Sequence, residues 1–269
     1  MPLSLLDKFR GAGGVARSLI VYWRPGRQKG LKRLYHPFIV PGEAAFDIGA
    51  HLGDRSAAFR ALGAKVVALE PQPALARWFR RVIKHDDVTL LPLAAGVEPG
   101  HAEIAISSAN PTLSTLAHDW RSRVGSQNAG FKRISWEQTL RVEVTTVDRL
   151  IDEYGMPCFI KIDVEGFEAE VLKGLSHPVA ALSVEFVAGV LEVSHACVEE
   201  ITRLGDYRFN AVAGERRDFR FDEWQTPEAI RRWLDDGAEG LASGDLYACR
   251  VGHPALAASE RSLFASSSR

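Results

Sequence analysis

The chain has 269 residues, of which 46% are hydrophobic and 25% are charged. These proportions exclude a fibrous or wholly disordered chain, because enough apolar side chains are present to offset the entropy that folding costs. The 33 basic and 34 acidic residues give a net charge of −1, so general binding of nucleic acid is not expected. The three cysteines form no CxxC pair, which argues against a disulfide framework or a structural zinc site and favours a reduced, cytoplasmic location.

The N-terminal segment, residues 1–38, is a basic extension in which eight Lys or Arg residues accompany Asp7 alone. Such a segment is suited to lie on an anionic membrane surface or to hold a phosphorylated lipid carrier. A helix packed on the domain, or a contact between two copies of the chain, would explain it equally well. The oligomeric state therefore stays open.

From residue 44 onward, short apolar runs alternate with longer amphipathic runs, which is typical of a parallel sheet covered by helices on both faces. The predicted strands cover residues 44–48, 65–69, 88–93, 101–106, 140–144, 158–162, 181–186, 207–212 and 245–251. The predicted helices cover residues 54–62, 73–84, 148–154, 167–172, 195–204 and 227–234. We therefore expect one α/β domain over residues 39–253, with about seven strands in its sheet.

The stretch from about 97 to 145 breaks the alternation and is expected to be an insertion. Between residues 107 and 136 it carries polar and aromatic side chains suited to covering a sugar-like acceptor, although a disordered surface insertion is the alternative. The tail, residues 254–269, is rich in Ala and Ser and is expected to be disordered.

The most informative segment is the turn after the first predicted strand, FDIGAHLGD at residues 46–54. Glycines let a backbone approach a ligand, and the following helix offers unpaired N–H groups. A dinucleotide site would read G-x-G-x-x-G, whereas this turn reads G-x-x-x-G and carries Asp47, which would repel a pyrophosphate and attract a cation. Glu70 ends the second strand, where an acid accepts hydrogen bonds from ribose hydroxyls.

Together, the two acids favour a positively charged nucleoside without phosphate, and S-adenosylmethionine has this chemistry. The alternative is that Gly49 and Gly53 only shape a tight turn and that Asp47 and Glu70 cap helices.

Four segments in this order resemble the FkbM family of S-adenosylmethionine-dependent methyltransferases: FDIGAHLGDRSAAF, VVALEPQP, TTVDRLI and FIKIDVEGFEAEVLKGL. The resemblance covers about residues 35–190 and implies a class I methyltransferase domain. This is a Rossmann-like, doubly wound α/β fold with three α/β/α layers and seven strands, mostly parallel with an antiparallel last strand. The implied reaction is methyl transfer to a hydroxyl of a small molecule, sugar or lipid-linked glycan.

The resemblance also implies the residues that bind the donor. Asp47, Gly49, Gly53 and Glu70 match the family positions, and the candidate site includes their neighbours Ala50, His51, Pro71 and Ala94. Many members carry an Asn in the turn after the third strand, where this chain reads Leu93-Ala94-Ala95-Gly96. Recognition of the adenine is therefore expected to rest on backbone groups and apolar contact.

Candidate catalytic residues follow the strand FIKID. Asp163 ends this strand, Glu165 and Glu168 come next, and Glu185 lies in the following strand. Three explanations compete for these acids: general-base catalysis, a hard cation such as Mg²⁺, and stabilisation of a helix N-terminus. Strand alternation places Lys161 on the same face as Asp163, where it would form an ion pair or anchor the substrate. We assign Asp163, Glu185 and Lys161 to catalysis and leave a metal open.

The sequence thus favours an S-adenosylmethionine-dependent O-methyltransferase that acts on a small molecule, sugar or glycan. One alternative is a nicotinamide-dependent oxidoreductase, and the missing third glycine and Asp47 count against it. Another is a non-catalytic binding protein that uses the same fold.

Overall fold

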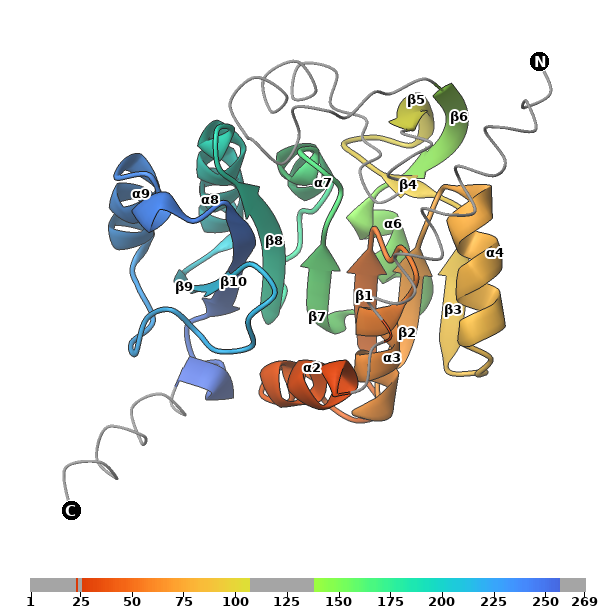
Figure 1. Cartoon of the computed structure of the whole chain (residues 1–269), viewed down its shortest axis with the longest axis horizontal. Coiled ribbons are helices and arrows are strands. Elements are labelled where there is room, and N and C mark those ends of the chain that lie inside the picture. Colours follow the sequence, from red (N-terminus) through yellow and green to blue (C-terminus); the bar gives the residue numbers. More distant parts are fainter. Residues whose placement is uncertain (1–22, 24–25, 107–137, 257–269) are drawn as a thin grey trace.

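The computed structural model describes residue 23 and residues 26–106 and 138–256. Seven strands form the main sheet in the order β3-β2-β1-β7-β8-β10-β9 (Figure 1). Their bounds are β1 (Ala44–Ile48), β2 (Lys65–Leu69), β3 (Val88–Leu91), β7 (Pro157–Ile162), β8 (Ala181–Val187), β9 (Tyr207–Ala213) and β10 (Ser243–Arg250). β10 runs antiparallel to both of its neighbours, and the other pairs are parallel. This confirms the predicted sheet with an antiparallel last strand.

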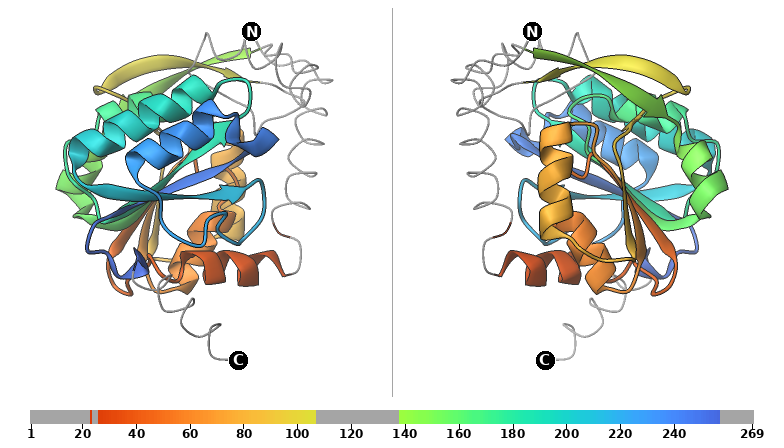
Figure 2. Two further views of the ribbon diagram at one scale, coloured as in Figure 1. Left: turned by 90° about the vertical axis from the view of Figure 1, so that its left-hand side faces the viewer. Right: turned by 90° about the vertical axis from the view of Figure 1, so that its right-hand side faces the viewer.

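Helices cover both faces of this sheet, as the apolar strands require. One face carries α6 (Val147–Tyr154), α7 (Glu168–Lys173), α8 (Leu191–Leu204) and α9 (Pro227–Asp235), and the other carries α2 (Arg27–Tyr35), α3 (Asp54–Ala61) and α4 (Pro73–Val82). Figure 2 shows the two groups with the sheet between them. Two of these helices begin at a threonine N-cap: the side chains of Thr146 and Thr226 accept hydrogen bonds from backbone N–H groups in the first turns of α6 and α9. The three-layer α/β/α arrangement is therefore confirmed.

The central strand β7 is buried along its whole length, which explains its run of apolar residues. Lys161 is the exception, because its side chain is charged and completely buried. A charge in such a position needs partners, and these lie at the candidate site described below.

Residues 27–38 pack onto the domain. Tyr35 and Phe38 are buried and contact the rings of Phe59 and Phe159. Arg27 forms an ion pair with Asp54 at the start of α3, with 2.6 Å between Nε and the carboxylate. This agrees with a helix packed on the domain, one of the interpretations of the basic segment.

A second sheet stands at the end of the main sheet, and two of its three strands come from the predicted insertion (Figure 1). It contains β4 (Ala94–Ala95), β5 (Gly100–Ile106) and β6 (Gln138–Thr145) in the order β4-β6-β5. The two-residue strand β4 and helix α2 were not predicted. The candidate acceptor loop at 107–136 and most of the tail lie outside the described residues. In the described ranges, no helix has the length and apolar character needed to cross a membrane.

Candidate active site

A cavity opens where β1, β2 and β7 end, at the edge where parallel α/β sheets bind ligands. Its empty volume is about 870 Å³ when the solvent in its open mouth is included. The lining comes from residues 48–51, 54–55, 69–72, 93–95, 104 and 163–165. Both predicted signatures, the glycine turn and the acid after β2, therefore contribute to one site.

The turn between β1 and α3 needs its two glycines for packing as well as for shape. Gly49 has a φ of +84°, and a Cβ there would lie 1.9 Å from the carbonyl oxygen of Asp163. Gly53 has a φ of +79°, and a Cβ would lie 2.5 Å from Phe79 and from Ile83. Gly49 lines the cavity, whereas Gly53 lies behind it against α4. The glycines thus let the turn pack closely against the end of β7.

Glu70 is a cavity-lining carboxyl that is only 3% exposed. Its Oε2 accepts a hydrogen bond from the backbone N–H of His51 at 3.0 Å, and its Oε1 accepts one from Gln72 at 2.8 Å. Burial raises the pKa of Glu70 to about 8, although the two N–H donors act in the opposite direction. In the ionised form each oxygen retains a lone pair, so the carboxylate can accept two further hydrogen bonds.

Asp47 lies under the floor of the cavity and is not part of its lining. Its carboxyl is 1% exposed and accepts a hydrogen bond from the hydroxyl of Ser56 in α3. Burial raises the pKa of Asp47 to about 6, against the effect of Ser56. The structure therefore supports a role for Asp47 in holding the turn to α3.

Asp163 faces the cavity within a network of buried charges. Lys161 Nζ lies 2.6 Å from Asp245 and 3.5 Å from Asp163 Oδ2, and Arg55 Nη2 lies 3.7 Å from the same Oδ2. Burial alone would raise the pKa of Asp163, but the charges of Lys161 and Arg55 outweigh burial and lower it. The predicted ion pair of Lys161 is confirmed, and its Nζ sits below the cavity as a positioning group.

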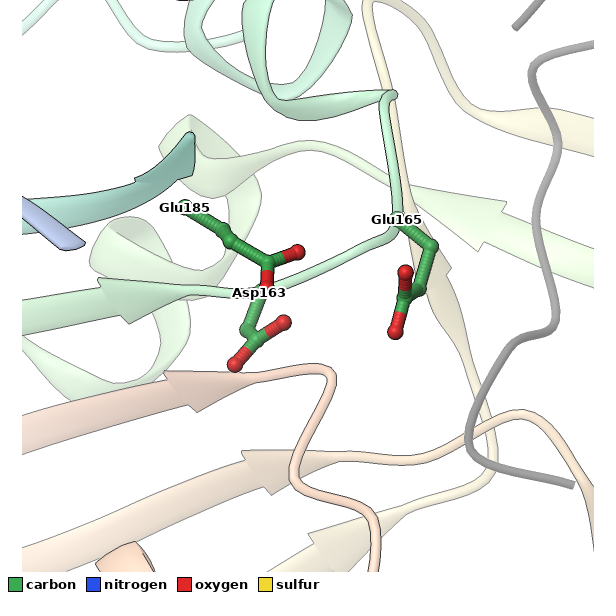
Figure 3. Close-up of side chains that lie close together, drawn as sticks. All are labelled: Asp163, Glu165 and Glu185. Atoms are coloured by element: carbon green, nitrogen blue, oxygen red, sulfur yellow. The ribbon is translucent and has the colours of Figure 1, made fainter. Parts of the chain in front are cut away.

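Glu165 and Glu185 complete a cluster with Asp163, shown in Figure 3. One carboxylate oxygen from each of the three lies within 4.8 Å of the others. Burial and the neighbouring acids raise the pKa of Glu165 and of Glu185 well above the usual value. Glu165 lines the main cavity, and Glu185 lines a small adjoining one. Carboxylate oxygens are ligands that hard cations accept, so the cluster offers a place for one.

Glu168 has a structural role in this region. It is 2% exposed, and its Oε1 accepts hydrogen bonds from the backbone N–H groups of Val164 and Gly166. These contacts hold the turn that presents Glu165. Glu168 is also the first residue of α7, the position that its interpretation as a helix N-terminal group requires.

The remaining predicted donor-site residues, Ala50, His51, Pro71 and Ala94, all line the cavity. His51 has a φ of +50°, and burial lowers its pKa to about 4, so its ring is neutral near pH 7. Leu93 and Ala94 provide the apolar surface expected where many family members have an Asn.

Sequence reasoning missed several residues of the site. Arg55 and Gln72 stood within the quoted motifs and received no role, whereas Ile104 comes from the second sheet and carried no signal. Asp245, the closest partner of Lys161, lies 84 residues away in the sequence. Asp245 stands at the start of a predicted buried strand, and a charged residue in such a position indicates that it has a partner of opposite charge.

Comparison with known proteins places this geometry in context. The family model described as the methyltransferase FkbM domain matches residues 47–239. The hexuronic acid methyltransferase AglP of Haloferax volcanii is 28% identical over 169 residues, which make up 60% of this chain and 61% of that protein. The chain therefore spans about three fifths of the length of this curated relative.

Solved structures with a similar arrangement are much more distant in sequence. Precorrin-6y C5,15-methyltransferase from Geobacter metallireducens is 14% identical with a TM-score of 0.43, and the match covers 82% of this chain and 86% of that one. A TehB-like SAM-dependent methyltransferase from Corynebacterium glutamicum is 12% identical with a TM-score of 0.40, and the match covers 82% and 87%.

Proposed function

Since the chain belongs to the FkbM methyltransferase family, we propose that it transfers a methyl group from S-adenosylmethionine to a hydroxyl group of a sugar or glycan. The observation that carries this proposal is the cavity lined by Glu70 after β2 and by Asp163 after β7, with the Gly49 turn after β1 between them. This arrangement suits a nucleoside that ends in a cation.

The residues present fit the donor. Glu70 keeps two acceptor sites for the ribose hydroxyls, and Leu93 and Ala94 supply an apolar surface for the adenine. Asp163, whose pKa is lowered, brings negative charge to the cavity at the end of β7, where it would attract a sulfonium and repel a pyrophosphate. This charge pattern favours the methyl donor over a nicotinamide dinucleotide.

The acceptor is proposed from the curated relative, whose name states that it acts on hexuronic acid. A sugar hydroxyl is only weakly acidic, so its attack on a methyl carbon benefits from a base and from alignment. A hexuronic acid glycoside is therefore the first acceptor to test.

The donor supplies a methyl group on a positively charged sulfur. The acceptor oxygen attacks the methyl carbon, the bond from this carbon to sulfur breaks with its electron pair left on sulfur, and the hydroxyl proton passes to a carboxylate. We take Glu185 as this base because its Oε2 is buried without a hydrogen-bond partner among the described residues and one of its oxygens lies within 4.8 Å of Asp163. Its raised pKa makes the ionised form of Glu185 a stronger base than Asp163. Asp163, ionised beside Lys161, instead favours a cation in the cavity.

A metal at the Asp163, Glu165 and Glu185 cluster would polarise the acceptor hydroxyl if one bound there. The three carboxylates suit such an ion by their chemistry, while Lys161 and Arg55 already supply positive charge next to Asp163.

The decisive experiment measures donor binding and methyl transfer with the full chain. Calorimetry should detect S-adenosylmethionine and no binding of NADH, and tritium should pass from the labelled methyl donor to a glucuronic acid glycoside. A parallel reaction with the matching glucoside tests whether the carboxylate of the acceptor matters, and EDTA tests for a metal. Binding of NADH without binding of S-adenosylmethionine would refute the proposal.

A further inference from the structure

Arg55 is the second residue of α3 and lines the cavity beside His51 and Asp163. Its side chain is 17% exposed, and its Nε is buried without a hydrogen-bond partner. Two carboxylates flank the guanidinium, with Nη1 3.7 Å from Asp54 and Nη2 3.7 Å from Asp163. Both distances exceed the range of a hydrogen bond. Within the described residues, Arg55 therefore holds a charge in the cavity wall while its donors stay unused.

The other buried cations of this region contrast with Arg55. Arg27 lies 2.6 Å from Asp54 and 2.8 Å from Glu215, and Lys161 lies 2.6 Å from Asp245. Asp54 thus has its closest cation in Arg27. A guanidinium carries five N–H donors in a planar fork that matches a carboxylate, and a buried donor without a partner is costly. Arg55 is consequently prepared to receive an anionic group that enters the cavity.

The neighbouring acid indicates which anionic group this is. Asp163 Oδ2 lies 3.7 Å from Arg55 Nη2, and both side chains line the same cavity. A carboxylate and a guanidinium side by side are complementary to the ammonium and carboxylate of an α-amino acid, because those two groups are attached to the same carbon. Glu70 lies in a different part of the lining, at the end of β2.

We propose that Arg55 binds the α-carboxylate of the amino-acid end of the methyl donor, with Asp163 facing its ammonium. This inference rests on the proposed function and assigns to Arg55 the recognition of the amino-acid end of the donor. Arg55 acts on the donor, so its contribution is measurable without any acceptor.

The test compares two ligands that share the nucleoside and the thioether. S-adenosylhomocysteine carries the amino acid, and 5′-methylthioadenosine lacks it. In the unchanged protein, calorimetry should show tighter binding of S-adenosylhomocysteine. Arg55→Met should weaken that binding by about tenfold to a hundredfold, as expected for hydrogen bonds between charged groups, and should change binding of 5′-methylthioadenosine less than twofold. The analogue of S-adenosylhomocysteine that lacks only the carboxylate should bind both forms equally.

Arg33→Met is the matched control, since Arg33 forms an exposed ion pair with Asp218 far from the cavity lining. It should leave both affinities unchanged. If Arg55→Met does not fold, Arg55→Lys keeps the charge and should weaken binding of S-adenosylhomocysteine by about threefold to tenfold, because an ammonium cannot pair with both oxygens at once.

The outcomes separate the inference from its premise. Equal losses for both ligands, or unchanged binding of S-adenosylhomocysteine in both Arg55 variants, would overturn the inference and leave the proposed function standing. Unchanged binding with a raised KM for the glucuronic acid glycoside would assign Arg55 to the acceptor instead and would also overturn it. Failure of the unchanged protein to bind either ligand would overturn the proposed function as well.

Discussion

Glu70 makes the affinity for nucleosides depend on pH. Its carboxyl has a pKa of about 8 in the free protein because it is buried, and only the ionised form accepts hydrogen bonds from both ribose hydroxyls. At pH 7 about a tenth of the protein is ionised at this group, and at pH 9 about nine tenths is, so the apparent affinity should rise about tenfold between them. Binding near pH 7 should release a proton.

The assay is calorimetric titration with 5′-methylthioadenosine, which has no amino-acid group that titrates in this range. Glu70→Gln should bind more weakly than the unchanged protein at pH 9 and should show no rise between pH 7 and 9. Glu43→Gln is the matched control, because Glu43 is exposed just before β1 and lies outside the cavity lining. A flat affinity profile in the unchanged protein, or the same rise in Glu70→Gln, would refute this reasoning.

The same pKa predicts how stability changes with pH. Between the usual 4.5 and about 8, the folded protein keeps a proton on Glu70 that the unfolded chain releases. The free energy of unfolding should therefore fall as the pH rises through this window and level off above it. The total decrease in the free energy of unfolding is at most about 5 kcal/mol, since each unit between the two pKa values corresponds to about 1.4 kcal/mol. Urea denaturation of the unchanged protein and of Glu70→Gln measures the difference.

Three further predictions follow from the packing and charges of the site. Gly49→Ala should lower the free energy of unfolding by more than about 1–2 kcal/mol. The positive φ disfavours Ala at this position, and the added Cβ would overlap the carbonyl oxygen of Asp163. An unchanged melting temperature would contradict this prediction. Lys161→Met should cost about 3–5 kcal/mol in urea denaturation, and adding Asp245→Leu should recover much of the loss. Glu185→Gln should lower kcat by about 10² to 10⁴ and leave the affinity for S-adenosylhomocysteine unchanged, whereas an unchanged kcat would remove Glu185 as the base.

The order and type of the elements could be predicted from the sequence because local patterns encode them. The apolar runs at Ala44–Ile48 and Lys65–Leu69 coincide with β1 and β2, and Pro73 begins α4 as expected. The glycine turn and Glu70 were recognisable because they directly follow these strands. Parallel strands bring their carboxyl ends to one edge, so local signals sufficed to place both at one cavity.

Contacts between distant parts of the chain could not be predicted from local sequence patterns. Only the tertiary structure joins Lys161 to Asp245 and places Arg55 between Asp54 and Asp163. It also shows that Asp47, which lies within β1 and pairs with Ala68 two residues before Glu70, accepts a hydrogen bond from Ser56 and is not part of the cavity lining. The sequence alone determined that the segments after β1, β2 and β7 reach the site, since hydrophobic periodicity is local. Which side chains line the cavity, and which pack behind it, depends on tertiary packing and on ion pairs between residues that are distant in the sequence.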